Sequence, residues 1–270
     1  MAKRHGPRRS GSSEHTRVPG REPRDKAAAG SGAVWLYGHH AVTAALGNPL
    51  RQRRRLVAVA DVAPEIEAQT GIAPEILKRE ALSALLPPDA VHQGVALAVD
   101  PLPPLNIEDI VEAAETAPAP QIVVLLDQVT DPHNIGAVLR SAAAFGALAV
   151  VVPEHGAPQI TGSLAKAASG AAELVPLIRV VNLVRALETL KEGGFWSVGL
   201  DGEAEKTLPE LAMTGKVVLA LGAEGPGLRR LTRDRCDHLA KLPTRGAIRS
   251  LNVSNAAAVA LYELTRSTAP

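Results

Sequence analysis

The sequence is poor in cysteine, in aromatic side chains and in long apolar runs, and each shortage excludes a class of protein. Cys236 is the only cysteine among 270 residues, so we expect no disulfide framework, no metal site and a reducing, cytoplasmic location. Trp, Tyr and Phe number two each, although 46% of the residues are hydrophobic, mostly Ala, Val and Leu. No apolar run reaches about 18 residues, so no transmembrane helix is expected, and no apolar segment of a secretory signal follows the first basic residues.

The net charge of +1 hides an uneven distribution along the chain. Residues 1–30 hold eight Lys or Arg against three acidic residues, a balance of +5, while the remainder carries −4. Residues 1–32 are also rich in Gly, Ser and Pro and show no hydrophobic period, which predicts a disordered basic arm. Such an arm suits a polyanionic partner, and a merely solubilising tail is the alternative.

Residues 33–100 have the pattern of a small domain with alternating helices and strands. Strands are predicted at 34–37, 55–60 and 95–99, and helices at 40–46, 64–69 and 78–85. Pro101, Pro103 and Pro104 then predict a stiff linker over 101–104, which we take as a domain boundary.

Residues 105–270 predict a doubly wound α/β domain. Apolar runs without alternation, as expected for strands buried on both faces of a parallel sheet, occur at 122–126, 148–152, 196–200 and 217–221. Helices are predicted near 135–145, 161–170, 182–192, 227–235 and 253–266. Ligands of such sheets bind at the carboxyl ends of the strands, so the loops that follow them are the candidates for chemistry.

The first candidate loop is LLDQVTDPHNIGAVLRSAAAFG, residues 125–146. Asn134 follows Pro132 and can cap the next helix, and an ordinary N-cap is the structural alternative to a functional role. Arg140 interrupts an otherwise apolar helix, which suggests an anionic partner or a cleft, although a solvated helix face also explains it.

Two further loops lie near the C-terminus. VVLALGAEGPGLRRLTRD, residues 217–234, places Glu224 between glycines, without the residues of a phosphate-binding loop or a dinucleotide fingerprint. Glu224 alone could simply favour a helix N-terminus. LPTRGAIRSLNVSNAAAVALYE, residues 242–263, has more small polar residues than one helix start needs. Ser254 or Asn255 is enough to cap the helix, so Ser250 and Asn252 are left for another role.

Taken together and in this order, the three loops resemble the motifs of the SpoU (TrmH-type) RNA ribose 2′-O-methyltransferases of the SPOUT superfamily. The likeness is carried by DPHNIGAVLRSAAAFG, LALGAEGPGL and LPTRGAIRSLNVSNAAAVALYE, and it extends through KAASGAAE at 166–173. YGHHAVTAAL and VHQGVALAV, at 37–46 and 91–99, also resemble the first and last segments of the family's L30e-like RNA-binding domain. This layout is most similar to bacterial enzymes that methylate a guanosine ribose in 23S rRNA.

The resemblance implies a trefoil-knotted α/β domain, a homodimer, S-adenosylmethionine as the cofactor, and RNA as the substrate. It implies cofactor contacts at Gly222, Leu242 and Leu251, and active-site roles for Asn134, Arg140, Glu224, Ser250 and Asn252. Arginine is always protonated, so we expect Arg140 to pair with a substrate phosphate and to stabilise the developing alkoxide rather than to act as a base. Thr244, where a Met is common in the family, and the basic Arg245 and Arg249 depart from the pattern.

The densest basic cluster of the predicted ordered part is Arg51, Arg53, Arg54 and Arg55. We predict that these side chains contact rRNA phosphates, with a solvated turn as the alternative. Two other functions stay open: a methyltransferase acting on a tRNA ribose, and a non-catalytic RNA-binding protein that assists ribosome assembly.

Overall fold

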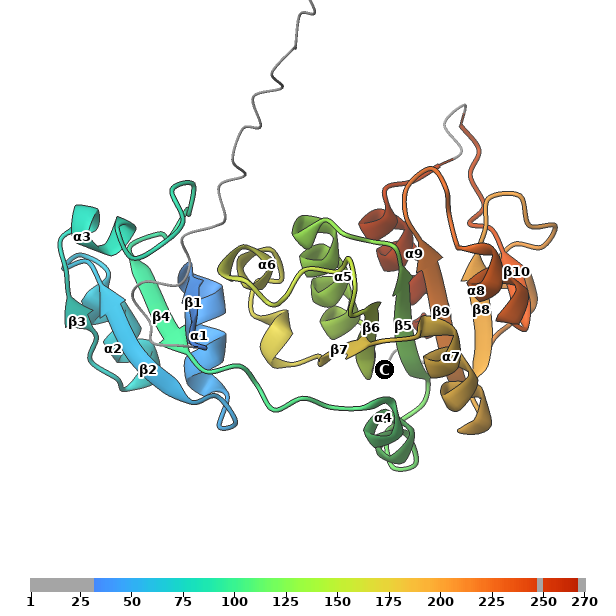
Figure 1. The fold of residues 1–270 in the computed structure, drawn as a ribbon, viewed down its shortest axis with the longest axis horizontal. Helices are drawn as coiled ribbons and strands as arrows, with labels where there is room; N and C mark the ends of the chain where they lie inside the picture. Colours follow the sequence, from blue (N-terminus) through green and yellow to red (C-terminus); the bar gives the residue numbers. More distant parts are fainter. Residues whose placement is uncertain (1–31, 247–249, 267–270) are drawn as a thin grey trace, which may run out of the picture.

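The computed structural model of the protein describes residues 32–246 and 250–266. Within these ranges the chain forms two lobes, each built on its own sheet (Figure 1). Apart from Gly32, the predicted basic arm lies outside the described residues. None of the helices in the two described ranges combines the length and the apolar character needed to cross a bilayer.

The small lobe holds a four-stranded sheet in the order β1-β4-β2-β3. Its elements are β1 (Val34–Tyr37), α1 (His39–Gly47), β2 (Arg53–Ala58), α2 (Ala63–Thr70), β3 (Glu75–Ile76), α3 (Arg79–Ser83) and β4 (Val95–Val99). β4 runs antiparallel to both β1 and β2, and only β3 pairs in parallel. One apolar cluster joins the sheet to α1 and α2, and a second joins its other face to Leu82 of α3.

The large lobe holds a six-stranded sheet in the order β10-β8-β9-β5-β6-β7, in which every recorded pairing is parallel. Its strands are β5 (Gln121–Asp127), β6 (Ala149–Pro153), β7 (Leu177–Val180), β8 (Trp196–Leu200), β9 (Lys216–Gly222) and β10 (His238–Ala240). Its helices are α4 (Ile107–Ala114), α5 (Pro132–Ala144), α6 (Gly162–Ala167), α7 (Leu183–Glu192), α8 (Arg230–Arg235) and α9 (Val253–Thr265), with short 3₁₀ turns η1 (Ala171–Glu173) and η2 (Pro209–Leu211). The predicted parallel α/β architecture is confirmed.

The strands of this sheet are apolar throughout because both of their faces are buried. In β5, Ile122, Val124 and Leu126 belong to the cluster with α5, α6 and α9, whereas Val123 and Leu125 belong to the cluster with α4 and α7. Successive side chains of a strand point to opposite faces. An uninterrupted apolar run is therefore what two helical layers require, and the large sheet is covered on both sides.

Among the strands and α-helices, β7, β3 and α4 were not predicted from the sequence. β7 contains Arg179, which breaks its apolar run, and β3 has only two residues. α4 begins with a capping box, in which the Asn106 backbone N–H donates to Asp109 at 2.7 Å. That box is a recognisable helix start, although it directly follows a proline-rich stretch that is typical of a linker. No regular structure covers 100–106, between β4 and α4.

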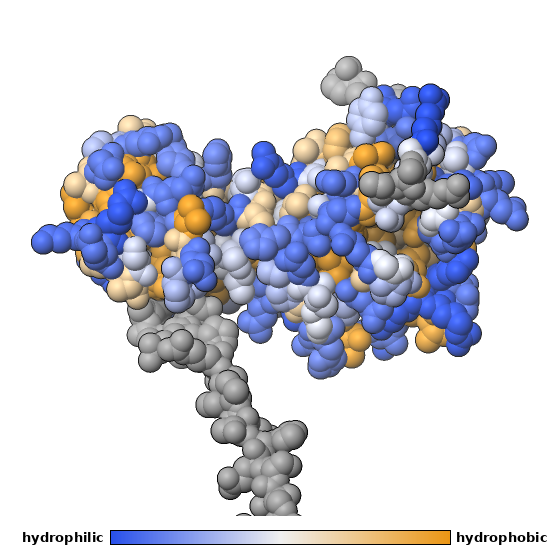
Figure 2. Space-filling model, turned by 90° about the horizontal axis from the view of Figure 1, so that it is seen from above, coloured by the Kyte–Doolittle hydropathy of each residue, from blue (hydrophilic) through white to orange (hydrophobic). Residues whose placement is uncertain are grey.

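The two lobes meet through α6, which lies beside β1 (Figure 1). Seen from above, hydrophilic residues cover most of both lobes, and the apolar residues form smaller patches scattered among the hydrophilic ones (Figure 2). Among the exposed large apolar side chains are two on α9, Val259 and Tyr262.

Candidate functional site

The three candidate loops meet at the carboxyl edge of the large sheet, where β5 and β9 are neighbours. A small cavity of about 160 Å³ opens there. Its wall is made by the loop after β5, the start of α5, the loop after β9 and the first residue of α9: Gln128, Val129, Thr130, Asp131, Asn134, Ala223, Glu224 and Val253. The position agrees with the rule for ligand sites in parallel sheets.

Asn252 connects the three loops through its side-chain amide. Its Nδ2 donates to Asn134 Oδ1 at 3.0 Å and to Glu224 Oε1 at 2.5 Å. Its Oδ1 accepts from the backbone N–H of Ser254 at 2.9 Å and from the Ser254 hydroxyl at 2.6 Å. The two donors on one side and the two acceptors on the other fix the orientation of the amide. Asn134, Glu224 and Asn252 therefore form one connected group.

The helix caps differ from the prediction. Asn252 itself is the N-cap of α9, so the prediction of Ser254 or Asn255 is wrong. At α5 the cap is Asp131, which accepts from the His133 N–H at 2.8 Å, and Asn134 lies inside the first turn. An acidic or amide side chain directly before the first helical residue explains both choices. Capping and site formation are thus not separate roles for Asn252.

The other proposed site residues do not join this hydrogen-bonded group. Arg140 is exposed and has no hydrogen-bond or ion-pair partner among the described residues. It follows Asn134 by six residues, which places it about 120° around the helix and about 9 Å along it. Ser250 is exposed and makes no side-chain hydrogen bond within the described chain. A single chain thus brings together Asn134, Glu224 and Asn252 but not Arg140 and Ser250.

The three positions proposed for cofactor contacts surround the same edge. Leu242 is half-buried against the cluster that includes α9, and Leu251 leaves 41% of its surface exposed. Gly222 has a role that the sequence did not reveal, because a Cβ there would collide with the backbone of Gly227 and Leu228. Its missing side chain lets the loop after β9 fold back on the end of the strand.

Asp127 and Arg229 are a pair that the sequence analysis missed. Asp127 ends β5 with a fully buried side chain, and it accepts from Arg229 Nε at 2.6 Å and from the Arg229 backbone N–H at 3.0 Å. Both bonds tie the end of the loop that carries Glu224 to β5. An acidic residue at the end of an apolar strand was the available signal, because a buried carboxylate needs a partner.

Replacing Arg229 by Ala should destabilise the protein more than replacing Asp127 by Asn. Arg229→Ala leaves a buried carboxylate without its guanidinium and should cost about 3 kcal/mol of unfolding free energy. Asp127→Asn removes the buried charge and leaves only a half-exposed arginine. Urea unfolding measures both. The matched control is Arg230→Ala, whose exposed pair with Asp234 should contribute less than about 0.5 kcal/mol, and equal losses for Arg229 and Asp127 would contradict the argument.

The basic cluster of the small lobe is not uniform. Arg51 is buried, with 3% of its side chain exposed, and pairs with Glu173 at 2.6 Å, so the prediction that it contacts RNA is wrong. Arg54 and Arg55 are exposed but already paired, with Asp100 and Glu75 respectively. Arg53 is exposed and has no recorded partner among the described residues.

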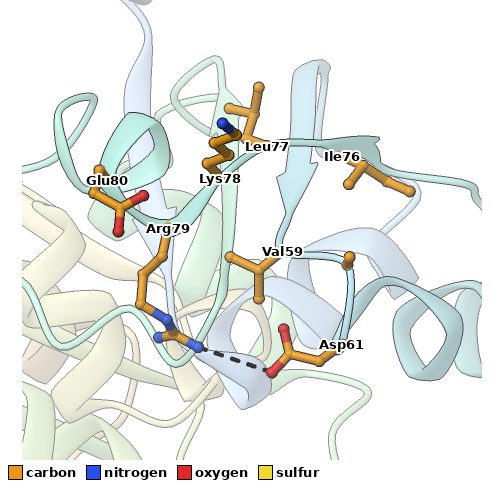
Figure 3. A pocket seen from close by; sticks show the side chains of 8 residues that line it. Val59, Asp61, Ile76, Leu77, Lys78, Arg79 and Glu80 are labelled. Carbon is orange, nitrogen blue, oxygen red and sulfur yellow. Dashed lines mark ion pairs between the residues drawn. The ribbon is translucent and has the colours of Figure 1, made fainter.

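A second cavity, of about 480 Å³, lies in the small lobe between the ends of β2 and β3 and the start of α3 (Figure 3). Arg79 points toward Asp61 across it at 3.9 Å, while Lys78 turns away. Its lining combines apolar side chains with two charges of each sign, Asp61 and Glu80 against Lys78 and Arg79, so it has no excess of positive charge for an anion.

Neither the cysteine nor a metal cluster offers an alternative centre within the described ranges. Burial raises the pKa of the Cys236 thiol to about 12, so this cysteine is not a thiolate nucleophile near neutral pH. Within the same ranges, no three His, Cys, Asp or Glu side chains gather closely enough to hold a metal ion.

Comparison with known proteins identifies the family of the chain. Residues 121–262 match the SpoU rRNA methylase family, and residues 35–105 match the domain described as RNA 2′-O ribose methyltransferase substrate binding. The chain belongs to the SpoU rRNA methylase family.

Individual relatives agree with this membership. The chain is 42% identical over 241 residues to a 23S rRNA (guanosine-2′-O-)-methyltransferase of Pseudomonas putida, covering 86% of this chain and 95% of the relative. The SpoU methyltransferase AviRb of Streptomyces viridochromogenes, solved with AdoMet, has a similar fold, with a TM-score of 0.74, 23% identity and coverage of 88% and 91%. A TrmH/SpoU tRNA modifying enzyme of A. aeolicus matches with a TM-score of 0.50 and 27% identity, over 59% of this chain and 81% of its own.

Proposed function

We propose that this protein transfers the methyl group of S-adenosylmethionine to the ribose 2′-hydroxyl of a guanosine in 23S rRNA. The observation that carries the proposal is the group formed by Asn134, Glu224 and Asn252 beside the cavity at the carboxyl edge of the large sheet. The relative from Pseudomonas putida, similar over nearly its whole length, supports the guanosine and the 23S rRNA as target.

Two observations weigh against the alternatives. The tRNA modifying enzyme of A. aeolicus covers only 59% of this chain, whereas the rRNA methyltransferase relative covers 86% and so includes most of the small lobe. Asn252 holds Glu224 at 2.5 Å and Asn134 at 3.0 Å beside an open cavity, and the capping of α9, which uses its Oδ1, requires neither bond. The first observation favours rRNA over tRNA, and the second favours a catalytic protein over a non-catalytic one.

The residues at this edge fit S-adenosylmethionine. Leu251, shortly before α9, is an exposed apolar side chain. Leu242, shortly after β10, is half-buried. At Gly225 and Gly227 a Cβ would meet nothing within 4 Å, so the outer side of this loop leaves room for a ligand to approach the backbone. We infer that Gly222, Leu242 and Leu251 hold the cofactor, which supplies a methyl group on a sulfonium and needs no further activation.

The protein then has to place the ribose hydroxyl and stabilise the charge that develops on its oxygen. The Oδ1 of Asn134 accepts a hydrogen bond from Asn252, so the Nδ2 protons of Asn134 are available to donate to a substrate oxygen. Glu224 keeps one carboxylate oxygen, Oε2, available as an acceptor beside it. Arg140 pairs with the substrate phosphate and stabilises the alkoxide electrostatically, and Ser250 contributes a hydroxyl to the pocket wall.

We further infer a homodimer in which Arg140 and Ser250 reach the site from the two subunits. Its support is the outer surface of α9, where Val259 and Tyr262 are 46% and 56% exposed. Tyr262 packs edge-on against Phe145, just past the end of α5, with ring centroids 6.3 Å apart. These residues form an apolar surface on the two helices that bear the site. Light scattering should give about twice the chain mass of 28.1 kDa.

The finer classification of the two lobes also follows from the resemblance of the motifs. We infer that the large lobe carries the trefoil knot of its family, which is a rare exception to the usual topology of folds. The small lobe is inferred to be L30e-like and to bind the RNA substrate, with the boundary between the domains in the proline-rich segment 101–104.

RNA binding by the small lobe should depend on Arg53. Arg53→Glu should weaken rRNA binding and reduce the slope of log affinity against log salt by about 0.7–0.9, as for the loss of one phosphate contact. Salt titrations of RNA binding measure both effects. Lys206→Glu is the matched control, since it changes the net charge equally at an exposed position of the large lobe. Equal effects of the two variants would show that only overall charge matters.

The decisive test of the proposed function uses S-adenosylmethionine with a radiolabelled methyl group. The protein is incubated separately with 23S rRNA, with tRNA and with DNA of the rRNA sequence. We expect label only in the rRNA, at one guanosine ribose, because the other two lack the correct sequence context or the 2′-hydroxyl. Label in the tRNA pool would support the tRNA alternative, and no label in any RNA would support the non-catalytic one.

A further inference from the structure

The two lobes are joined by a buried ion pair that lies far along the chain from the candidate site residues. Arg51, in the segment after α1, donates from Nε and Nη2 to the two carboxylate oxygens of Glu173 at 3.1 and 2.6 Å. Each side chain is only 3% exposed. Asn48 Nδ2 adds a further bond to Glu173 Oε2 at 2.8 Å, and Arg51 Nη1 donates to the backbone oxygen of Asp100 at 2.9 Å. The pair therefore joins the segment after α1 and the residue before the linker, both of the small lobe, to η1.

The two lobes also pack closely at other points of the same interface, along α6. Ala165 of α6 is 3% exposed and belongs to the apolar cluster of the small lobe. A Cβ at Gly162 would collide with the Tyr37 ring and with the backbone oxygen of Trp35. Lys166 donates from Nζ to the backbone oxygen of Val91, in the segment before β4. The segment 162–173 thus contacts the small lobe at several independent points.

The same segment supports the helix that carries Asn134 and Arg140. A Cβ at Gly136 of α5 would lie 2.5 Å from Ala167 Cβ and 2.9 Å from the backbone oxygen of Leu164. α5 and α6 therefore touch backbone to backbone. The small lobe therefore contacts both α6 and η1, and α5 packs against both of these elements. The buried charge pair lies where the small lobe meets η1.

We propose that Arg51 and Glu173 are positioning residues that hold the small lobe at one orientation to the methyl-transfer site. This inference rests on the proposed function, since it assigns the two lobes to one RNA substrate. RNA bound on the small lobe then reaches α5 along a fixed path, and that path decides which nucleotide arrives beside Asn134. Neither Arg51 nor Glu173 touches the RNA or the reacting atoms.

The test begins with Glu173→Gln, which keeps the shape of the side chain and removes its charge. An uncompensated buried guanidinium should loosen the interface, so KM for 23S rRNA should rise about tenfold while kcat and cofactor affinity stay within about twofold. The double variant Arg51→Met with Glu173→Met removes both charges and should recover most of the lost affinity, because an apolar pair can replace a buried ion pair. Failure of the double variant to recover affinity would overturn the role of the charge pair.

A second variant opens the interface without changing the pair. Gly162→Ala adds one methyl group between α6 and β1, whereas Gly202→Ala, where a Cβ meets nothing within 4 Å, is its matched control. Gly162→Ala should raise KM for rRNA as Glu173→Gln does, and Gly202→Ala should leave it unchanged. Thermal unfolding checks that each variant is folded.

A distance measurement separates this inference from the proposed function. Spin labels are placed at Glu67→Cys on α2 and Arg185→Cys on α7, both exposed, in a Cys236→Ser background. When labelled chains are diluted with unlabelled ones, so that each inferred dimer holds one labelled subunit, they report the separation of the lobes without any substrate. A single narrow distance in the wild type that broadens in Glu173→Gln and narrows again in the double variant supports the inference. A distribution unchanged by Glu173→Gln overturns it even if the protein methylates rRNA, whereas absent methylation with the expected distances overturns only the proposed function.

Discussion

Arg140→Ala should lower the rate of RNA methylation by about 10³-fold and leave the fold intact. A guanidinium that stabilises developing negative charge contributes an effect of this size. The side chain is exposed and has no partner among the described residues, so its removal disturbs no packing, and alanine is a good helix former. Single-turnover methylation should show the loss, with thermal unfolding and cofactor binding unchanged.

Two comparisons make the Arg140 result specific. Arg185→Ala removes an exposed arginine from α7 in the same lobe and should keep full activity. Arg140→Lys keeps the charge but loses the planar, two-pronged contact with phosphate, so it should recover only part of the rate. Near-wild-type methylation by folded Arg140→Ala would remove Arg140 from the proposed mechanism.

Asn252→Asp should separate the two roles of Asn252. Aspartate caps a helix as well as asparagine does, so α9 should begin as before and thermal stability should change little. At the site, however, the Nδ2 donor becomes a carboxylate oxygen facing Glu224, where the present distance is 2.5 Å. Repulsion should displace Glu224, and misplacement of a site group by about 1 Å can cost about 10² in rate.

The activity of Asn252→Asp relative to wild type should rise at low pH, which a general loss of folded structure would not produce. In this variant, the ionisation of one of two adjoining carboxyls raises the pKa of the other, because like charges disfavour each other. As the pH falls through that raised pKa, one shared proton restores a hydrogen bond, so the activity relative to wild type should increase. Asn255→Asp adds the same charge in the first turn of α9 at an exposed position and should show neither effect. A constant ratio to wild type across pH would contradict the argument.

Much of the fold could be predicted because its signals are local and repeated. The run Ile122–Leu126 indicates a strand buried on both faces, and the structure places its alternate residues in two separate clusters. β7 could not be found in this way, since Arg179 interrupts it and donates to backbone oxygens at Glu154, Ala157 and Pro158. A charged residue inside a strand becomes understandable only when its distant acceptors are known.

The site was predictable to a lesser degree, for a related reason. Motif resemblance selected Asn134, Glu224 and Asn252, but residue type alone assigned the caps of α5 and α9 to the wrong residues. Arg51 illustrates the same limit, because four arginines close together indicate a basic surface until the carboxylate of Glu173, 122 residues away, is placed beside one of them. Partners distant in sequence determine which charges remain free.

The side-chain amide of Asn252 both caps α9 and holds Glu224, so hydrogen exchange in the first turn of α9 can monitor the site. The N–H of Ser254 is bonded to Asn252 Oδ1, and the N–H of Ala256 to the Asn252 backbone oxygen. When the first turn of α9 opens, the link to Asn134 and Glu224 must open with it. Exchange at these two amides therefore reports how often the site comes apart, and any ligand that needs the assembled site should slow it.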